Sequence, residues 1–306
     1  MEKIAIKYFE VFANYGCNLR CIGCSSFCDY MVEGIPNWET IEHDLKKWAD
    51  ILNVENIGVL GGEPLMNPDL YKWLEGIRNI YNNSTMLLVT NGLLLDRWPD
   101  LIKKMIDLSP GEVMITLHVD YAEIIEKIQR QIKNSKYRFI KKAHKDQAYY
   151  EVEYILFAKN KKFSIHVIEP DKFLKRYKGY GKNIYPYEND NIEEAHELCI
   201  DRPIMYEGKI YRCSKMALLK RQLMITGQFF DQKEIGPWKP YLDYEGVSYN
   251  DDIEKIQSCI AQFDKAEMVC KSCPGKSDDC MIKNEQNMQV FSFNNKNFIG
   301  TNKEGI

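Results

Sequence analysis

Short apolar runs alternate with longer segments of helical periodicity along the first 120 residues. Residues 38–52 place two tryptophans and three aliphatic side chains on one helical stripe, as expected for a helix that covers a sheet. Strands are predicted at 8–13, 56–60, 85–90 and 112–117, and further helices at 69–81 and 98–108. Because strands and helices alternate, we expect a parallel sheet whose functional residues lie in the loops that follow the strands.

This alternation weakens after about residue 133. Residues 149–157 and 163–168 are strand-like, but the segment 158–162 between them is too short for a helix. A hairpin or a long sheet extension therefore fits as well as two further strand–helix units, and we expect a barrel that closes early or incompletely. Residues 180–193 are rich in Gly, Pro, Asn and Tyr and indicate a linker, which divides the chain into 1–190 and 191–306.

Composition excludes several broad classes of protein. The chain has 306 residues, 45% of them hydrophobic, and a net charge of −3, which is typical of a globular protein with a sizeable core. No apolar run reaches the roughly 18 residues of a membrane span, and the first residues lack the apolar segment of a secretory signal. We therefore expect a cytoplasmic protein with no membrane partner.

The charge is distributed unevenly. Residues 127–182 hold 16 lysines and arginines against 5 aspartates and glutamates, so the rest of the chain has a net charge of −14. This segment is either a solvated surface or a lining for a substrate that bears phosphate or carboxylate. Nucleic-acid binding is not indicated, because no recognition motif accompanies the charges.

Ten cysteines require an explanation, because a reducing cytoplasm does not favour structural disulfides. They form two groups separated by 170 residues without cysteine, which predicts two separate metal or redox sites. The first group is Cys17, Cys21, Cys24 and Cys28, and the second is Cys199, Cys213, Cys259, Cys270, Cys273 and Cys280.

The first three cysteines have the spacing C-x3-C-x2-C. Three thiolates this close in one loop can bind three irons of a [4Fe–4S] cluster and leave the fourth iron open to a small molecule. The alternative is a zinc site, for which Cys28 would supply the fourth ligand.

Together with Gly61-Gly62-Glu63-Pro64 after the second strand, this spacing resembles the radical S-adenosylmethionine (SAM) superfamily. The resemblance implies a partial (β/α)6-type TIM barrel, or a truncated form of it. It also implies a [4Fe–4S] cluster on Cys17, Cys21 and Cys24. SAM would chelate the open iron, and the reduced cluster would cleave it to a 5′-deoxyadenosyl radical that abstracts hydrogen from a substrate. The matching SAM-binding residues are Gly61, Gly62, Glu63, Pro64, Asn91 and Thr116.

Three residues near this motif have roles that the sequence leaves open. Many family members have an aromatic residue before the third cysteine, near the adenine, where this chain has Gly23, so the adenine contact must be arranged differently. We expect Cys28 to be a core residue. His118, just past the fourth strand, either caps the surface or is a polar group over the active site.

The second cysteine group predicts an auxiliary site. Gly208 lies between two strand-like runs, so Cys199 and Cys213 should flank a hairpin, and Cys270 and Cys273 form a C-x2-C pair. The pattern resembles the twitch appendage, a half-sized SPASM domain that holds one auxiliary [4Fe–4S] cluster. Cys259 or Cys280 could replace one of the four ligands, and zinc at the same four residues is the alternative.

The sequence thus predicts an enzyme that abstracts a hydrogen atom from a small, carbohydrate-like or anionic substrate, in a dehydrogenation or an epimerisation. A reducing partner such as flavodoxin or ferredoxin would supply the electron. The alternatives are a maturase of ribosomal peptides, which the short segment before Cys17 disfavours, and a non-enzymatic iron–sulfur or zinc scaffold, which leaves Gly61 to Pro64 unexplained.

Overall fold

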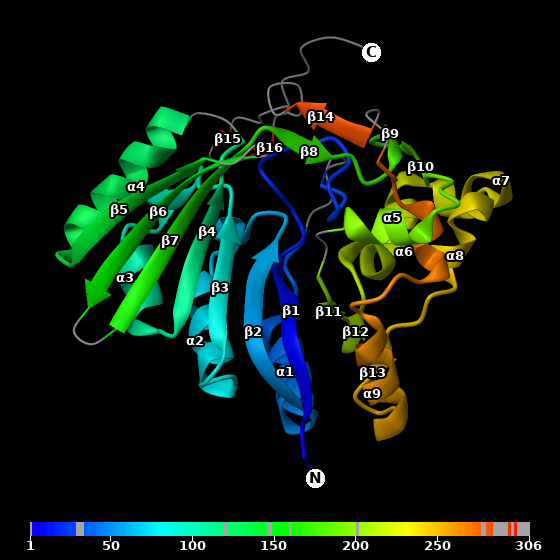
Figure 1. Ribbon diagram of the computed structural model, residues 1–306, viewed down its shortest axis with the longest axis horizontal. Helices are drawn as coiled ribbons and strands as arrows, with labels where there is room; N and C mark the ends of the chain where they lie inside the picture. Colours follow the sequence, from blue (N-terminus) through cyan, green and yellow to red (C-terminus); the bar gives the residue numbers. More distant parts are fainter. Residues whose placement is uncertain are drawn as a thin grey trace.

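A ten-stranded sheet forms the centre of the computed structural model (Figure 1), which describes residues 2–28, 34–118, 121–145, 149–158, 161–199, 202–276, 280–283, 293–294 and 297–298. Its strands are β1 (Ile4–Asn14), β2 (Leu52–Gly61), β3 (Thr85–Thr90), β4 (Gly111–Thr116), β5 (Arg138–Lys145), β6 (Tyr149–Ala158), β7 (Lys161–Pro170), β11 (Ile204–Tyr206), β12 (Lys209–Tyr211) and β13 (Val247–Ser248). They lie in the order β13–β12–β11–β1–β2–β3–β4–β7–β6–β5.

Six neighbouring strands of this sheet are parallel, in the order β11–β1–β2–β3–β4–β7. Antiparallel strands extend the sheet on both sides, and within the described residues β13 and β5 are its edges. The α/β fold with a partial barrel is therefore confirmed, and the described sheet does not close. The carboxyl ends of the six parallel strands lie at one end of the sheet, where loops of distant segments meet.

Helices cover one face of the parallel strands (Figure 1). They are α1 (Trp38–Ile51), α2 (Leu70–Ile80), α3 (Leu101–Asp107) and α4 (Tyr121–Ser135). The side chain of Asn37 accepts a hydrogen bond from the backbone N–H of Thr40 and so caps α1. The predicted stripe is the buried face of this helix, with Leu45 and Trp48 fully buried in the main core.

The region after residue 133 forms a hairpin, one of the two arrangements that the sequence left open. β6 and β7 are antiparallel, and β7 also pairs in parallel with β4. The predicted linker 180–193 is more ordered than a linker, because it includes most of an antiparallel pair, β9 (Lys178–Tyr180) and β10 (Asn183–Tyr185), and the start of α5 (Ile192–Glu197). Ile184 of β10 is fully buried, so packing fixes this segment despite its polar composition.

A second core cluster lies beside β11 and includes residues of α6 (Ser214–Thr226) and α8 (Lys239–Leu242). The predicted hairpin at Gly208 is confirmed, since β11 and β12 pair antiparallel and Gly208 has a φ of +75°. The other elements are η1 (Pro64–Met66), η2 (Leu95–Arg97), η3 (Gln228–Phe230), α7 (Gln232–Ile235), η4 (Gly236–Trp238), α9 (Ile253–Gln262), η5 (Met268–Ser272), β15 (Phe293–Asn294) and β16 (Asn297–Phe298). In the described part of the chain, no helix is long and apolar enough to cross a membrane.

A two-stranded sheet crosses above the carboxyl ends of the parallel strands (Figure 1). It pairs β8 (Lys172–Leu174), which follows β7, with β14 (Met281–Lys283). The backbone N–H of Lys175 donates to the carbonyl of Cys280, and that of Arg176 donates to the carbonyl of Gly23. The first bond attaches the segment after β7 to the residue before β14, and the second attaches it to the first cysteine loop.

Three charged side chains from neighbouring strands yield a pH prediction. His166 on β7 lies 2.7 Å from Glu151 on β6 and 3.6 Å from Glu112 on β4, and hydrogen bonding to Glu112 and Glu151 raises the pKa of His166 to about 9. Because the folded pKa exceeds the unfolded value, this stabilisation is complete below about pH 6.5 and is lost as the pH rises through about 9.

We therefore expect the substitution His166→Gln to lower the free energy of unfolding near pH 6.5 by about 1 kcal/mol, a value reduced by solvent screening. Near pH 9.5 the same substitution should have little effect. Urea unfolding at both pH values measures the difference, and His43→Gln on the exposed face of α1 is the control. Equal losses for His166→Gln at both pH values would contradict the assignment.

Candidate functional site

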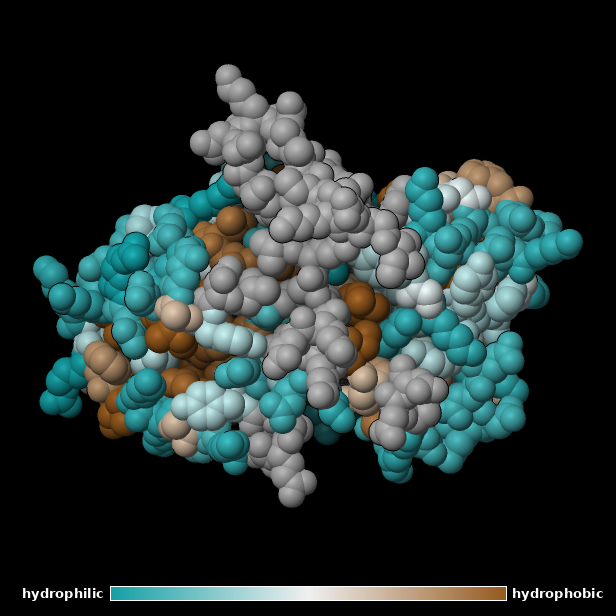
Figure 2. Space-filling view, turned by 90° about the horizontal axis from the view of Figure 1, so that it is seen from above, coloured by the Kyte–Doolittle hydropathy of each residue, from teal (hydrophilic) through white to brown (hydrophobic). Residues whose placement is uncertain are grey.

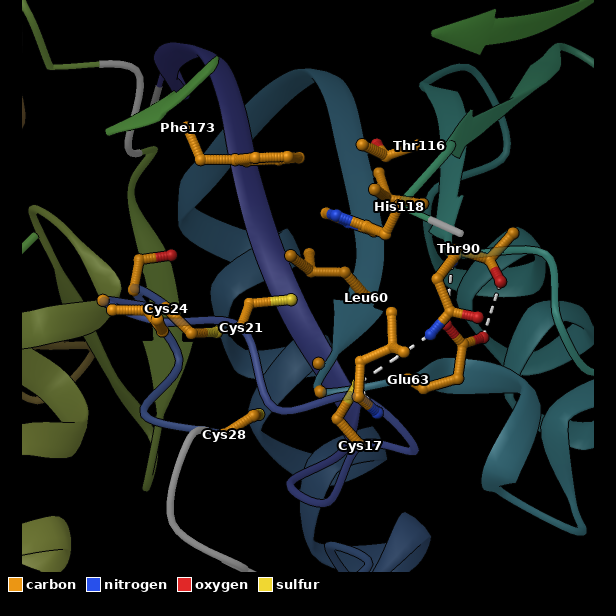
Figure 3. Close-up of a pocket in the computed structure, with 18 of the residues that line it drawn as sticks. Cys17, Cys21, Cys24, Cys28, Leu60, Glu63, Thr90, Thr116, His118 and Phe173 are labelled. Atoms are coloured by element: carbon orange, nitrogen blue, oxygen red, sulfur yellow. Dashed lines mark hydrogen bonds between the residues drawn. The ribbon is translucent and has the colours of Figure 1, made fainter. Parts of the chain in front are cut away.

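A cavity of about 260 Å³ lies at the carboxyl ends of the parallel strands (Figure 3). The loop after β1 contributes Cys17, Cys21 and Cys24 to its wall, and the loop after β2 contributes Gly61, Gly62 and Glu63. Later strands add Thr90, Asn91, Thr116 and His118, and the segment after β7 adds Phe173, Leu174 and Arg176. The structure therefore brings together the first cysteine group and five of the six predicted SAM-binding residues, while Pro64 is buried at the start of η1 outside the wall.

The cysteine loop presents its sulfurs to the cavity without gathering them at one point. A zinc ion needs four ligand atoms, with sulfurs about 2.3 Å from the metal. Among the described residues, no three Cys, His, Asp or Glu side chains are grouped to hold one metal ion. A [4Fe–4S] cluster takes its thiolates on separate irons, so three sulfurs around one cavity can bind a cluster without meeting at one point.

Arg20 stabilises this loop from inside. Its side chain is 2% exposed, and one guanidinium nitrogen donates hydrogen bonds to the carbonyls of Cys17, Leu19 and Cys28. Because buried carbonyls need donors, these bonds hold the loop in shape independently of any bound group.

The two glycines after β2 are needed because another chain segment passes close to them. A Cβ at Gly61 would lie 2.0 Å from the carbonyl oxygen of Asn14, and a Cβ at Gly62 would lie 2.0 Å from that of Gly16. Both carbonyl oxygens accept hydrogen bonds from this loop: that of Asn14 from Gly62 N–H and that of Gly16 from Glu63 N–H. The glycines therefore join the second loop to the cysteine loop, in addition to any approach of their backbone to a ligand.

Glu63 joins the loops that follow β2 and β3. Its carboxylate is fully buried and accepts hydrogen bonds from Leu65 N–H (3.0 Å), the Thr90 hydroxyl (2.6 Å) and Asn91 N–H (2.9 Å). Burial raises the pKa of Glu63 to about 7, although the three hydrogen bonds act in the opposite direction. Three of the four acceptor positions of the carboxylate are thus used by the protein, and one remains.

Asn91 and Thr116 occupy the third and fourth strand ends as the sequence predicted. The Asn91 side chain donates to Asn18 in the cysteine loop (2.8 Å) and accepts from Leu93 N–H, so it connects the first and third loops. Thr116 is the last residue of β4, and its side chain lines the cavity in Figure 3.

His118 points into the cavity, which favours the active-site interpretation over surface capping. Its ring stacks on Phe173 of β8, with centroids 4.7 Å apart and planes at 22° (Figure 3). Burial lowers the pKa of His118 to about 4, so the imidazole is neutral at pH 7. Its Nδ1 atom is buried and has no hydrogen-bond partner among the described residues, so it is available to a ligand.

Comparison with known proteins identifies a domain that includes this cavity's first three loops. The profile of the Radical SAM superfamily matches residues 13–147. The chain carries a radical SAM domain. Proteins of this family use a [4Fe–4S] cluster with SAM, and the cavity lined by Cys17, Cys21 and Cys24 fits that pair of cofactors.

Individual relatives are distant. The chain is 27% identical over 213 residues to the FeMo cofactor biosynthesis protein NifB of Methanocaldococcus infernus. These residues cover 60% of this chain and 68% of NifB. It is 28% identical over 102 residues to GTP 3′,8-cyclase of Alkaliphilus oremlandii, about a third of each protein. The crystal structure of selenomethionine BtrN in an open conformation covers 92% of both chains at 14% identity, with a TM-score of 0.39.

Cys28 is a buried neighbour of the radical SAM cysteines. It is 2% exposed, and hydrogen bonding with Cys17 and Cys24 raises the pKa of its thiol. Its sulfur lies 3.6 Å from the carbonyl of Tyr15. The expected core position is therefore observed, at the edge of the same cavity.

The second cysteine group partly converges beyond the radical SAM cavity. Cys213, Cys270 and Cys273 are buried in the second core cluster, and Cys199 follows α5, which packs against the helix η5 that holds Cys270. Cys259 instead packs at the edge of the main core. The thiol of Cys280 lies 3.2 Å from the carbonyl oxygen of Gly275.

Two polar groups contact the sulfur of Cys273. The ammonium of Lys215, a residue only 2% exposed, lies 2.9 Å from it, and the hydroxyl of Tyr241 lies 2.8 Å from it. A buried ammonium is costly without a negative partner, and a thiolate or a thiolate-bound cluster provides one. The surroundings of Cys273 therefore fit an anionic group.

The basic segment 127–182 is mostly a solvated surface. Every residue of β5 is exposed, and Figure 2 shows hydrophilic residues beside hydrophobic ones at the end of the molecule where α4 and β5 lie. Lys127 and Arg176 are exceptions, at 7% and 6% exposed, and of these two Arg176 lines the cavity. The net charge of the segment therefore does not describe the cavity.

Sequence reasoning missed Arg20, Phe173 and Arg176 as site residues. Phe173 and Arg176 follow β7, the sixth parallel strand, so the rule that functional residues follow parallel strands applies to them. Interpreting 163–168 as one arm of a hairpin hid this, because β7 pairs with strands on both sides.

The bonds of Glu63 predict its contribution to stability. Glu63→Ala should lower the free energy of unfolding by about 3 kcal/mol, because three buried donors lose their acceptor. Glu63→Gln keeps one acceptor oxygen and should lose less. Anaerobic urea unfolding gives both values, with Glu39→Ala on the exposed face of α1 as the control. A loss for Glu63→Ala no larger than that for Glu39→Ala would refute the bridging role.

Proposed function

We propose that this protein is a radical SAM enzyme that abstracts a hydrogen atom from a small, carbohydrate-like or anionic substrate. The observation that carries this proposal is the cavity itself, where the C-x3-C-x2-C sulfurs face the ends of three further parallel strands. With SAM bound, the reduced cluster supplies a 5′-deoxyadenosyl radical. The chain supplies the seat for these groups and excludes water from it.

The protein groups around the cavity have distinct tasks in this proposal. Cys17, Cys21 and Cys24 hold the cluster, and the loop at Gly61 to Glu63 receives the amino end of SAM. Glu63 keeps this loop and Asn91 in register, and its remaining acceptor position is suited to an amino N–H. Thr116 presents a hydroxyl for the ribose.

Phe173 and Leu174 of β8 form part of the cavity wall above the strand ends. The cluster and SAM would occupy this cavity, so the substrate would have to bind beside them.

We further propose one auxiliary [4Fe–4S] cluster on Cys199, Cys213, Cys270 and Cys273, in a C-terminal unit of residues 191–306 that follows the radical SAM unit 1–190. The buried contact between Lys215 and Cys273 supports an anionic group there. An auxiliary cluster would provide the electron acceptor that dehydrogenation requires, so its presence favours dehydrogenation over epimerisation.

A low-potential donor such as flavodoxin or ferredoxin would supply the electron for SAM cleavage. Such donors and reduced thiols belong to a reducing compartment, so we propose a cytoplasmic location.

The radical SAM activity has a direct test. Anaerobically reconstituted protein with SAM and dithionite should form 5′-deoxyadenosine, and Cys17→Ala, Cys21→Ala or Cys24→Ala should abolish it because each removes a cluster ligand. Cys259→Ala, which changes a thiol at the edge of the main core, should keep the wild-type rate. Intact cleavage in all three single variants would rule out the proposed activity.

Metal content and product tests separate the two clusters. The wild type should bind about eight irons per chain, and the double variant Cys270→Ala/Cys273→Ala about half as many. This variant should still form 5′-deoxyadenosine without substrate, because its cysteines lie outside the SAM cavity, but it should form no dehydrogenated product. About four irons with one zinc in the wild type, or normal product formation by the double variant, would disprove the auxiliary cluster's role.

A further inference from the structure

A second, smaller cavity adjoins the SAM cavity and has no role in the site described so far. It has a volume of about 160 Å³. Ser25, Leu60 and Arg176 line both cavities, and the remaining wall of the smaller one is formed by Glu10, Ser26, Arg202 and Ser214. A molecule bound in the smaller cavity would therefore lie beside the cofactors.

Arg176 is held in place between the two cavities by the cysteine loop. Its backbone N–H donates to the carbonyl of Gly23 at 3.2 Å. Gly23 has a φ of +69°, and a Cβ there would lie 2.8 Å from the Cα of Lys175 and 2.9 Å from the N of Arg176. The glycine that replaces the aromatic residue of many family members thus makes room for the segment that contains Arg176. The Arg176 side chain itself is 6% exposed.

The rest of the smaller cavity has the composition of an anion site. Its wall includes two guanidiniums, Arg176 and Arg202, and one carboxylate, Glu10. Ser25 and Ser26 add two hydroxyl groups. Ser214 begins the 13-residue helix α6, and its hydroxyl donates to the carbonyl of Ser25 at 3.1 Å, so the helix start and the cysteine loop are joined at this wall. The positive end of the helix dipole adds to the excess of positive charge.

We propose that this cavity binds an anionic group of the substrate, a carboxylate or a phosphate, through Arg176 and Arg202. Guanidinium groups form paired, charge-assisted hydrogen bonds with both kinds of oxyanion. This inference rests on the proposed function, because the reacting C–H bond must then lie in the adjoining SAM cavity. It narrows the substrate to a small molecule with a carboxylate or phosphate a short distance from the carbon that loses hydrogen, and Glu10 disfavours a second negative group nearby.

The binding test uses simple anions and does not depend on SAM cleavage. Inorganic phosphate, followed by ³¹P line broadening, and succinate, followed by saturation-transfer difference NMR, are titrated into anaerobic holoprotein. We expect saturable binding of at least one anion, weakened at least tenfold by Arg176→Gln and several-fold by Arg202→Gln. The control is Arg130→Gln. Arg130 lies on α4, is exposed and pairs with Asp96, so this substitution should leave the anion affinity unchanged.

Two further measurements separate the competing explanations. Arg176→Lys should regain part of the affinity, because it restores the charge without the fork geometry. SAM affinity, measured by equilibrium dialysis, should fall less than anion affinity in both glutamine variants. If Arg176→Gln does not fold, the exposed Arg202 decides the test alone.

The outcomes distinguish this inference from the proposed function. Three results would overturn the anion site: no anion binding, equal binding by the wild type and the glutamine variants, or a loss of SAM affinity equal to the loss of anion affinity. In the last case the cavity would bind the carboxylate of SAM itself. A protein that binds anions through these arginines but forms no 5′-deoxyadenosine would overturn the proposed function and leave the anion site intact. Preference for phosphate or for succinate identifies the substrate class.

Discussion

The buried carboxylate of Glu63 is the interaction on which the geometry of the site depends. It accepts hydrogen bonds from its own loop, at Leu65, and from the loop after β3, at Thr90 and Asn91. Its backbone N–H is bonded to Gly16, so the cysteine loop is part of the same network. Parallel pairing brings strand ends to one side of the sheet, but it does not set the loops in register. Glu63 does so, at the cost of burying a carboxylate whose pKa rises to about 7.

The segment after β7 completes the cavity from the other side. Phe173 stacks on His118, and Arg176 is bonded to Gly23 through its backbone. These contacts connect the ends of β4 and β7 to the cysteine loop, so groups from distant segments surround one small space. Apolar and aromatic side chains such as Leu60 and Phe173 form part of its wall and help to exclude water from the polar groups beside them.

The segment from β11 onward is joined to this sheet and yet has its own buried polar centre. β11 pairs with β1 and extends the parallel strands, while Cys213, Cys270 and Cys273 lie in a separate core with Lys215 and Tyr241. A buried ammonium is costly unless negative charge lies nearby, and the sulfur of Cys273 can supply that charge as a thiolate. The surroundings of Cys273 therefore fit an anionic group, which is compatible with the proposed auxiliary cluster.

The sequence alone was sufficient for the fold class, the first cysteine loop and the residues at the ends of β2, β3 and β4. These features depend on periodicity and motifs within short stretches of the chain. Such stretches can be interpreted without knowing which strands pair with one another. It was not sufficient for the parallel role of β7, for Arg176 at the cavity, or for the bridging bonds of Glu63. Those depend on which strands pair and on how closely two backbones approach, as at Gly23 and Gly61, where a single Cβ would not fit. Such contacts join residues far apart in the chain, so only the tertiary structure decides them.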